Sequence, residues 1–145
     1  MDSSIENSLR ETFAEQIIES TEIFGVMNLK IAPGSLLGMC QKLHSEMGFD
    51  YLADITAIDF NDRIEVVYQL TNLSNNSRVA LRLDLDRERP EVDSLTSIWN
   101  GADFQEREVY DLMGVVFERH PNLTRILLPL DWEGYPLRKD YVIDD

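Results

Sequence analysis

Residues 51–86 carry the pattern that most restricts the fold, because apolar and polar side chains alternate along them with a period of two. Every second position is apolar in 64–70 (Ile, Val, Tyr, Leu) and in 78–86 (Val, Leu, Leu, Leu), and 51–60 is apolar with small interruptions. Two turn-rich stretches, NDR and TNLSNNS, join the three segments. Such strands place one face on a core and leave the other wet or partly covered. The pattern predicts an antiparallel three-strand meander.

The segments before the meander predict helices and one further strand. Apolar residues recur at every fourth position from Ile5 to Ile17, which predicts a helix over residues 4–22. Residues 26–31 form a short β-prone segment, and a second helix is expected between Pro33 and Gly48. This strand–helix–strand passage indicates one parallel crossover. The predicted fold is therefore α+β, a small mixed sheet with helices on one face.

The last third of the chain has a different character. Residues 91–100 are interpreted as a short helix, and a further helix is expected to end at Met113, just before Gly114. Beyond it lie three of the five prolines and scattered large apolar residues that a folded chain has to bury, which predicts an extended irregular segment. Its content of Trp, Tyr, Leu and Arg is typical of interfaces. We divide the chain into an α+β domain, residues 1–98, and a signature helix with an extended C-terminal segment, residues 99–145, which is expected to pack on that domain and on a partner subunit.

The helix that ends at Met113 carries charged residues on or beside its apolar stripe. Glu106 lies on the same face as apolar residues one turn away, so it sits within the apolar stripe of this helix. Arg107 is four residues from both Asp103 and Asp111, so both pairs can touch across one helical turn. Paired carboxylates would suit acid–base catalysis or metal binding, whereas an arginine placed between them favours neutralisation.

Three interpretations of this helix remain open at the level of residue pattern: a solvated face, a free-standing enzyme built on Glu106, Glu108 and Asp111, and a structural ion-pair network at a packed or inter-subunit surface. More distant charged residues favour the network, because arginine pairs well with partly buried carboxylates. These residues are Arg125, Arg138, Lys139 and Asp140.

The composition excludes several functional classes. The 13 Lys and Arg against 27 Asp and Glu give a net charge of −14, which disfavours nucleic acid and anionic membrane surfaces as partners. The single cysteine, Cys40, cannot form an internal disulfide, and no nucleotide-binding, nucleophile-elbow or HExxH motif occurs. The longest apolar runs are far too short to span a membrane, and no secretory leader is seen, so we expect a soluble chain. With one cysteine and no His/Cys cluster, the chain is expected to hold no iron–sulfur cluster or structural zinc by itself.

The stretch from Trp99 to Tyr141 resembles the signature of the thirty-kilodalton subunit of respiratory complex I, known as the C subunit in bacteria and the J subunit in photosynthetic organisms. The matching elements are ADFQEREVYDLMG, then HPNLTRIL, then DWEGYPLRKDY, in the right order and spacing. The upstream part resembles the family's α+β domain more loosely. Phe104 stands where many relatives have tryptophan, and Met113 stands where many have an aromatic residue, so both positions keep a large apolar side chain.

The resemblance implies a structural, non-redox subunit in the peripheral arm of an ion-pumping NADH:quinone oxidoreductase. It implies packing on the large forty-nine-kilodalton-type subunit (the D subunit of bacteria), which helps to form the quinone site, and near the iron–sulfur subunits. The resemblance also implies that this chain holds no cofactor, and that partner chains hold the iron–sulfur clusters, flavin and quinone. The alternative is the same role in an F420H2 dehydrogenase, a ferredoxin-dependent complex or an energy-converting hydrogenase. A separate hypothesis is an adaptor protein that is unrelated to respiration.

The location implied by the resemblance is peripheral, on the cytoplasmic side of the membrane. No catalytic residue is implied. The expected interface or scaffold residues are Glu106, Arg107, Asp111, Arg125, Trp132, Arg138, Lys139 and Asp140.

Overall fold

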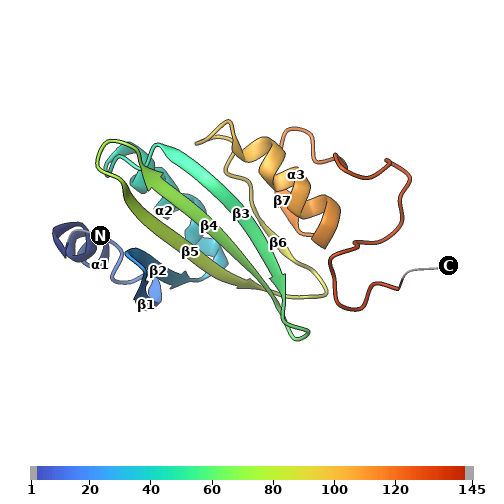
Figure 1. The fold of residues 1–145 in the computed structure, drawn as a ribbon, viewed down its shortest axis with the longest axis horizontal. Helices are drawn as coiled ribbons and strands as arrows, with labels where there is room; N and C mark the ends of the chain where they lie inside the picture. The colour runs from blue at the N-terminus through green and yellow to red at the C-terminus, as the bar shows by residue number, and fades with distance from the viewer. Residues whose placement is uncertain (1–2, 143–145) are drawn as a thin grey trace.

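The computed structural model describes residues 3–142, and a five-stranded mixed sheet is its central element (Figure 1). The strand order is β1-β2-β5-β4-β3, and a separate pair, β6 and β7, lies beside helix α3. The strands are β1 (Ile17–Ile23), β2 (Val26–Ile31), β3 (Tyr51–Asp59), β4 (Ile64–Asn72), β5 (Ser77–Leu85), β6 (Glu91–Asp93) and β7 (Val116–Glu118). The helices are α1 (Ser3–Thr12), the 3-10 turn η1 (Pro33–Ser35), α2 (Leu36–Ser45) and α3 (Ala102–Met113).

The predicted meander is confirmed. β3 pairs antiparallel with β4, and β4 pairs antiparallel with β5, with Tyr68 opposite both Ile55 and Leu81. The predicted parallel crossover is also present, but the two strands that it connects, β2 and β3, are not neighbours in the sheet. β2 pairs in parallel with β5, so the passage through α2 carries the chain across the sheet to β3 at the opposite edge.

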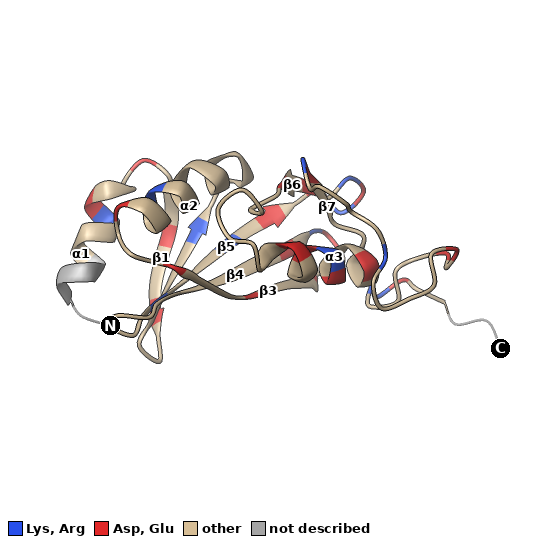
Figure 2. Ribbon diagram, turned by 90° about the horizontal axis from the view of Figure 1, so that it is seen from above, with Lys and Arg blue, Asp and Glu red and all other residues tan. Residues whose placement is uncertain are grey.

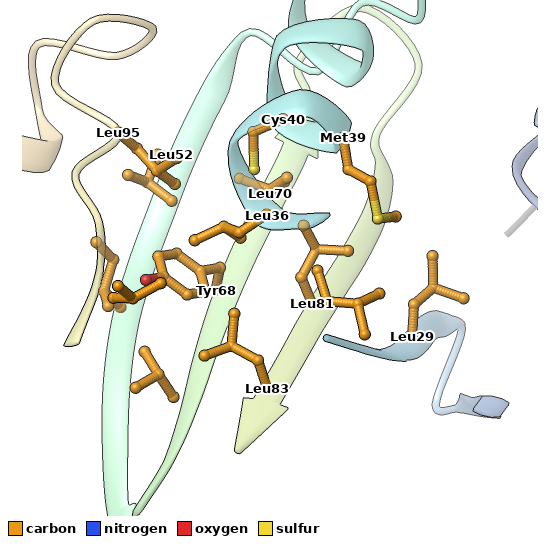
Figure 3. Packing of buried hydrophobic residues seen from close by; sticks show 14 of the residues in the cluster. Leu29, Leu36, Met39, Cys40, Leu52, Tyr68, Leu70, Leu81, Leu83 and Leu95 are labelled. Atoms are coloured by element: carbon orange, nitrogen blue, oxygen red, sulfur yellow. The ribbon is translucent and has the colours of Figure 1, made fainter. Parts of the chain in front are cut away.

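The core lies between α2 and the sheet (Figure 3). Leu36, Cys40 and Leu43 of α2 are fully buried, as the helical spacing predicts, and they face the buried side chains of β4 and β5. Tyr68 is the largest of these buried side chains, and it is fully buried at the centre of β4. Burying such side chains contributes about 1.5–3 kcal/mol each, so this layer is the main source of stability for the fold.

The other face of the sheet carries a network of charged side chains in place of a second apolar layer. Lys30 Nζ on β2 lies 2.9 Å from Glu65 Oε2 on β4 and 2.7 Å from Asp84 Oδ1 on β5. Arg82 Nη1 on β5 donates to Glu65 Oε1 at 2.6 Å, and Arg63 Nε donates to Asp84 at 3.2 Å. These pairs join three strands side by side, and they agree with the prediction that one face is only partly covered.

Two predictions about secondary structure are wrong. The helix expected over residues 4–22 ends at Thr12, and residues 17–23 form β1, which pairs antiparallel with β2. The sequence of β1, IIESTEI, is rich in β-branched residues, which favour strands once a neighbouring edge can accept them. The short helix expected over 91–100 is replaced by β6, which pairs in parallel with β7.

Helix α3 forms as predicted and ends at Gly114, whose φ of 79° is left-handed and therefore favours glycine. It packs against the edge strand β3 (Figures 1 and 2). Beyond β7, residues 119–142, here called the C-terminal segment, contain no helix or strand; they loop outward beside α3 and return to the end of β3. This agrees with the predicted irregular segment.

Candidate interaction surface of α3 and the C-terminal segment

Glu106 occupies the buried face of α3, as its position in the apolar stripe predicts. The side chain is fully buried, and its hydrogen-bond donors are a hydroxyl and a backbone amide. Ser94 Oγ donates to Oε1 at 2.6 Å and the Leu95 amide donates to Oε2 at 2.7 Å. Burial raises the pKa of Glu106 to about 7, although both hydrogen bonds act in the opposite direction and the charge of Asp103 adds to the rise. Glu106 therefore ties α3 to the chain that leads into it from β6.

Asp111 is the second fully buried carboxylate of α3, and it holds the C-terminal segment. Arg125 Nη1 donates to Oδ1 at 2.8 Å, and the amides of Ile126, Leu127 and Leu128 donate to Oδ2 at 3.2, 2.7 and 3.0 Å. Burial alone would raise the pKa of Asp111, but the hydrogen bonds from Arg125 and the three amides together hold it below its usual range. One carboxylate thus fixes four consecutive residues that have no secondary structure.

Arg107 does not form the ion pairs along the helix that its spacing predicts. Its guanidinium donates instead to the Thr124 carbonyl and hydroxyl, both at 3.1 Å, and to the Arg125 carbonyl at 3.3 Å. Asp103 lies against His120, with Oδ1 3.0 Å from the ring Nε2. The expected network exists, but it joins α3 to the C-terminal segment and not one helical turn to the next.

The far part of the C-terminal segment is anchored by Arg138 and by the Lys139 backbone. Arg138 Nε donates to the Met113 carbonyl at 2.6 Å, and the Lys139 amide donates to Asp59 Oδ2 at 2.9 Å. Asp59, at the end of β3, also accepts two hydrogen bonds from Arg87 at 2.9 and 2.8 Å, which hold its pKa well below its usual range.

The predicted RKD residues therefore contribute in different ways. Arg138 acts through its side chain, Lys139 acts through its backbone amide while its side chain is exposed, and the exposed Asp140 lies 3.3 Å from Arg87. Sequence reasoning missed Asp59 and Arg87. The available signal was an aspartate closing an apolar strand just before a turn, where an exposed position is the usual expectation.

Tyr135 joins these anchors. Its ring lies 5.0 Å from the guanidinium carbon of Arg125 and 5.6 Å from that of Arg138, and it meets Tyr110 edge-on at 6.1 Å between centroids. The ring also lies so close to Gly114 that a Cβ there would stand 2.7 Å from Tyr135 Cδ2. The glycine that ends α3 is thus required both for its left-handed backbone and for the close approach of this ring.

The outer face of the C-terminal segment is apolar and exposed. The exposed fractions are 59% for Leu127, 79% for Leu130, 40% for Trp132, 61% for Leu137 and 75% for Val142. The expectation that this segment buries its large side chains is therefore wrong for Leu127, Trp132 and Leu137, although the polar groups of the segment are held by several hydrogen bonds. Several large apolar side chains displayed on one short, fixed segment are typical of a surface that meets another protein.

An apolar groove continues this surface between β3 and α3. It has a volume of about 140 Å³, and Ile55, Ala57, Glu108, Val109 and Leu137 are among the residues that line it. Strand β3, helix α3 and the C-terminal segment thus meet at this groove.

The arrangement of Glu106 and Asp111 does not suit catalysis on a bound substrate. Both carboxylates are fully buried, and each is occupied by its own donors, so neither faces a cavity shared with the other. Burial also raises the pKa of the Cys40 thiol, which disfavours the reactive thiolate. In the described part of the chain, His, Cys, Asp and Glu side chains do not gather in threes as a metal site requires. The helices within residues 3–142 also include none that could cross a membrane.

Comparisons with known proteins agree on one family. Residues 29–145 match the family described as the 30 kDa subunit of the respiratory-chain NADH dehydrogenase. The chain is 44% identical over 126 residues to the NADH-quinone oxidoreductase C subunit of Moorella thermoacetica, covering 86% of this chain and 85% of the relative. It is 38% identical over 136 residues to the C subunit of Citrifermentans bemidjiense, covering 92% and 84%.

Two solved structures share the fold. A trypsin-resistant fragment of Nqo5 superposes with a TM-score of 0.72 at 33% identity, covering 82% of this chain and 98% of that one. A chain of the membrane-bound sulfane sulfur reductase, an archaeal respiratory membrane complex, shares the fold with a TM-score of 0.83 at 22% identity, covering 97% and 85%. The meander, the signature helix and the sequence match lead to one conclusion: this chain belongs to the family of the 30 kDa subunit of respiratory-chain NADH dehydrogenase, which includes the C subunits of bacterial NADH-quinone oxidoreductases.

Proposed function

We propose that this chain is a non-redox structural subunit in the peripheral arm of a complex I-type, ion-pumping NADH:quinone oxidoreductase. In this proposal its C-terminal segment docks on the large forty-nine-kilodalton-type subunit that helps to form the quinone site, here called the large quinone-site subunit. The chain itself takes no part in electron transfer, and the neighbouring chains hold the iron–sulfur clusters, flavin and quinone.

The single observation that carries this proposal is the contrast between the two sides of the C-terminal segment. On the inner side, Asp111 and Asp59 hold the backbone through hydrogen bonds to the amides of residues 126–128 and 139. On the outer side, Leu130 and Trp132 are exposed. A segment that is fixed before it meets a partner loses less conformational entropy on docking, so its apolar surface is available for affinity.

The side chains that could ligate a metal or an iron–sulfur cluster support a role without redox groups. Cys40 is the only cysteine and is buried in the core, whereas cluster ligation needs several thiolates or imidazoles at one place. The buried carboxylates of α3 are used to hold the chain's own backbone. The proposal therefore assigns Glu106, Arg107, Asp111, Arg125 and Arg138 to scaffolding.

The proposed location is peripheral, on the cytoplasmic side of the membrane, where the rest of the complex holds the chain. The electron donor is read by other subunits, so the same scaffold would serve an F420H2-, ferredoxin- or hydrogen-dependent complex. Capture of this chain from gently solubilised membranes identifies the donor-oxidising subunit. NADH-binding chains in stoichiometric amount support the proposed form, and their replacement by another donor-oxidising chain contradicts it.

The scaffolding role is tested by separating assembly from turnover. Arg107→Ala and Asp111→Ala are expected to lower the amount of assembled complex far more than the turnover of each assembled complex. Leu130→Ser and Trp132→Ser, which alter exposed side chains, are expected to do the same without changing the stability of the free chain. Leu73→Ser, at the exposed loop between β4 and β5, is the matched control and should assemble normally.

Two outcomes would overturn the role. Normal assembly with lost turnover would assign chemistry to α3. A monodisperse monomer that does not copurify with the large quinone-site subunit would remove the proposed partner.

A further inference from the structure

The turn between β1 and β2 places an aromatic residue in a backbone conformation that it rarely adopts. Ile23 pairs with Val26, so the loop consists of Phe24 and Gly25, with φ angles of 50° and 78°. Two positive φ angles in a two-residue hairpin loop are the mark of a type I′ turn, in which Asn-Gly is the preferred pair. A bulky residue at the first position is strained, because its Cβ crowds the backbone.

Phe24 gains no burial in exchange for this strain. Its side chain is 96% exposed, and it is the most exposed of the large apolar residues in residues 7–142. Ile18 and Ile23 on the same hairpin are also exposed, at 64% and 46%. An unfavourable backbone conformation together with an unburied aromatic ring is costly for the free chain, and such strain concentrates at functional positions.

The hairpin lies at the opposite end of the long axis from the C-terminal segment (Figures 1 and 2). A partner bound along α3 and the C-terminal segment therefore lies at the far end of the molecule from Phe24. The hairpin is thus a separate surface, and an explanation of Phe24 requires a different neighbour or a different part of a large one.

The charge of the whole chain indicates what kind of neighbour fits. The loop residues Phe24 and Gly25 are uncharged, and they lie on a chain of net charge −14. An anionic lipid surface and a second copy of this acidic chain are both repelled. A protein surface with an apolar pocket and a basic rim complements an exposed aromatic side chain on a strongly acidic chain.

We propose that Phe24 is an anchor residue that inserts into an apolar, basic-rimmed pocket of a second protein subunit, separate from the contact made by the C-terminal segment. The chain then acts as a bridge between two contacts at the ends of its long axis. The inference goes beyond the proposed scaffold function, because it assigns a contact to the end of the molecule that the scaffold argument does not use.

The experiment uses the opposite effects that Phe24→Asn has on folding and on binding. Asparagine suits the type I′ position, so the thermal midpoint of the free full-length chain is expected to rise by about 3 °C. Loss of the aromatic anchor is expected to make urea-induced release of the chain from the purified complex at least tenfold faster. Phe24→Tyr keeps both the ring and the strained backbone, and it should match the wild type in both measurements.

Each other outcome overturns the inference. If Phe24→Asn stabilises the chain and release is unchanged, the exposed ring has no partner in the complex. A lower midpoint for Phe24→Asn would refute the turn argument. A wild-type dimer in sedimentation that Phe24→Asn abolishes would replace the second subunit with a second copy of the chain. Leu130→Ser is measured in parallel: if it speeds release while Phe24→Asn does not, the scaffold function stands and the anchor alone is refuted.

Discussion

Replacing Asp111 with asparagine tests whether one buried carboxylate holds the C-terminal segment in place. Asparagine has nearly the same shape as aspartate, but it is neutral and one of its two polar atoms is a donor. In the wild type both oxygens accept, one from Arg125 and the other from three consecutive amides. Whichever way the amide group turns, its NH2 faces donors, so one set of hydrogen bonds is lost.

The magnitude follows from what remains unpaired. Removing one partner of a buried ion pair costs about 3–5 kcal/mol. Arg125 retains hydrogen bonds to the carbonyls of Asp111 and Gly134, at 2.8 and 2.7 Å, and its contact with the Tyr135 ring. The expected loss is therefore at the lower end, about 3 kcal/mol, which corresponds to roughly a hundredfold change in an opening equilibrium.

Because the lost bonds belong to the C-terminal segment, the effect should be local. Hydrogen exchange, measured on the full-length chain, should show the amides of residues 126–128 exchanging about a hundredfold faster, while the amides of β4 and β5 keep most of their protection. Asp131→Asn is the matched control, since it makes the same chemical change at an exposed position of the same segment and should alter exchange little.

Equal protection of residues 126–128 in Asp111→Asn and the wild type would refute the anchoring argument. A uniform loss of protection across the sheet would also contradict it, because the segment would then be part of one cooperative unit with the core.

Two further predictions concern the stability of the free chain. The pKa of Glu106 is about 7 when folded and near 4.5 when unfolded, so the folded chain keeps a proton between these pH values and stability should fall as pH rises through this window. Glu106→Gln should flatten that dependence, measured as urea midpoints from pH 5 to pH 8, and parallel profiles would contradict the assignment. Gly114→Ala should destabilise by at least about 1–2 kcal/mol, because of its left-handed φ and the Tyr135 ring. Gly38→Ala in α2, where a Cβ meets nothing within 4 Å, should stabilise by about 0.5–1 kcal/mol, and thermal melts of both variants check the opposite signs.

Much of the sheet and core could be predicted because the relevant forces are local. The alternation in β4 and β5 reflects one buried face, and the spacing of Leu36, Cys40 and Leu43 reflects the buried side of α2. β1 could not be predicted in the same way. Its apolar residues continue the helical spacing of the preceding segment, and only the unpaired edge of β2 makes a strand the better solution.

In the candidate site, too, features set by nearby residues could be predicted, whereas contacts between distant residues could not. The burial of Glu106 follows from the helical stripe, which is a property of nearby residues. The partners of the charged residues cannot be read from the helical stripe, because they come from distant positions. Arg107 contacts Thr124, and Asp59 accepts a hydrogen bond from the amide of Lys139, 80 positions away. Helical spacing identifies pairs that can touch, whereas the fold decides which pairs do. The residues that matter could thus be named in advance more readily than their contacts.

The parallel pairing of β2 with β5 has a consequence for how the chain folds during synthesis. Leu29 pairs with Leu81, 52 positions later, so β2 leaves the ribosome roughly 3 to 10 s before its partner strand exists. A two-stranded hairpin is marginally stable alone, so β1 and β2 dock late, after the meander has formed through its short loops. Until then the edges of β2 and β5 are open to foreign strands. Lys30 and Arg82, neighbours in the finished sheet, each place a charged side chain on one of these edges, a feature that disfavours edge-to-edge pairing with foreign strands.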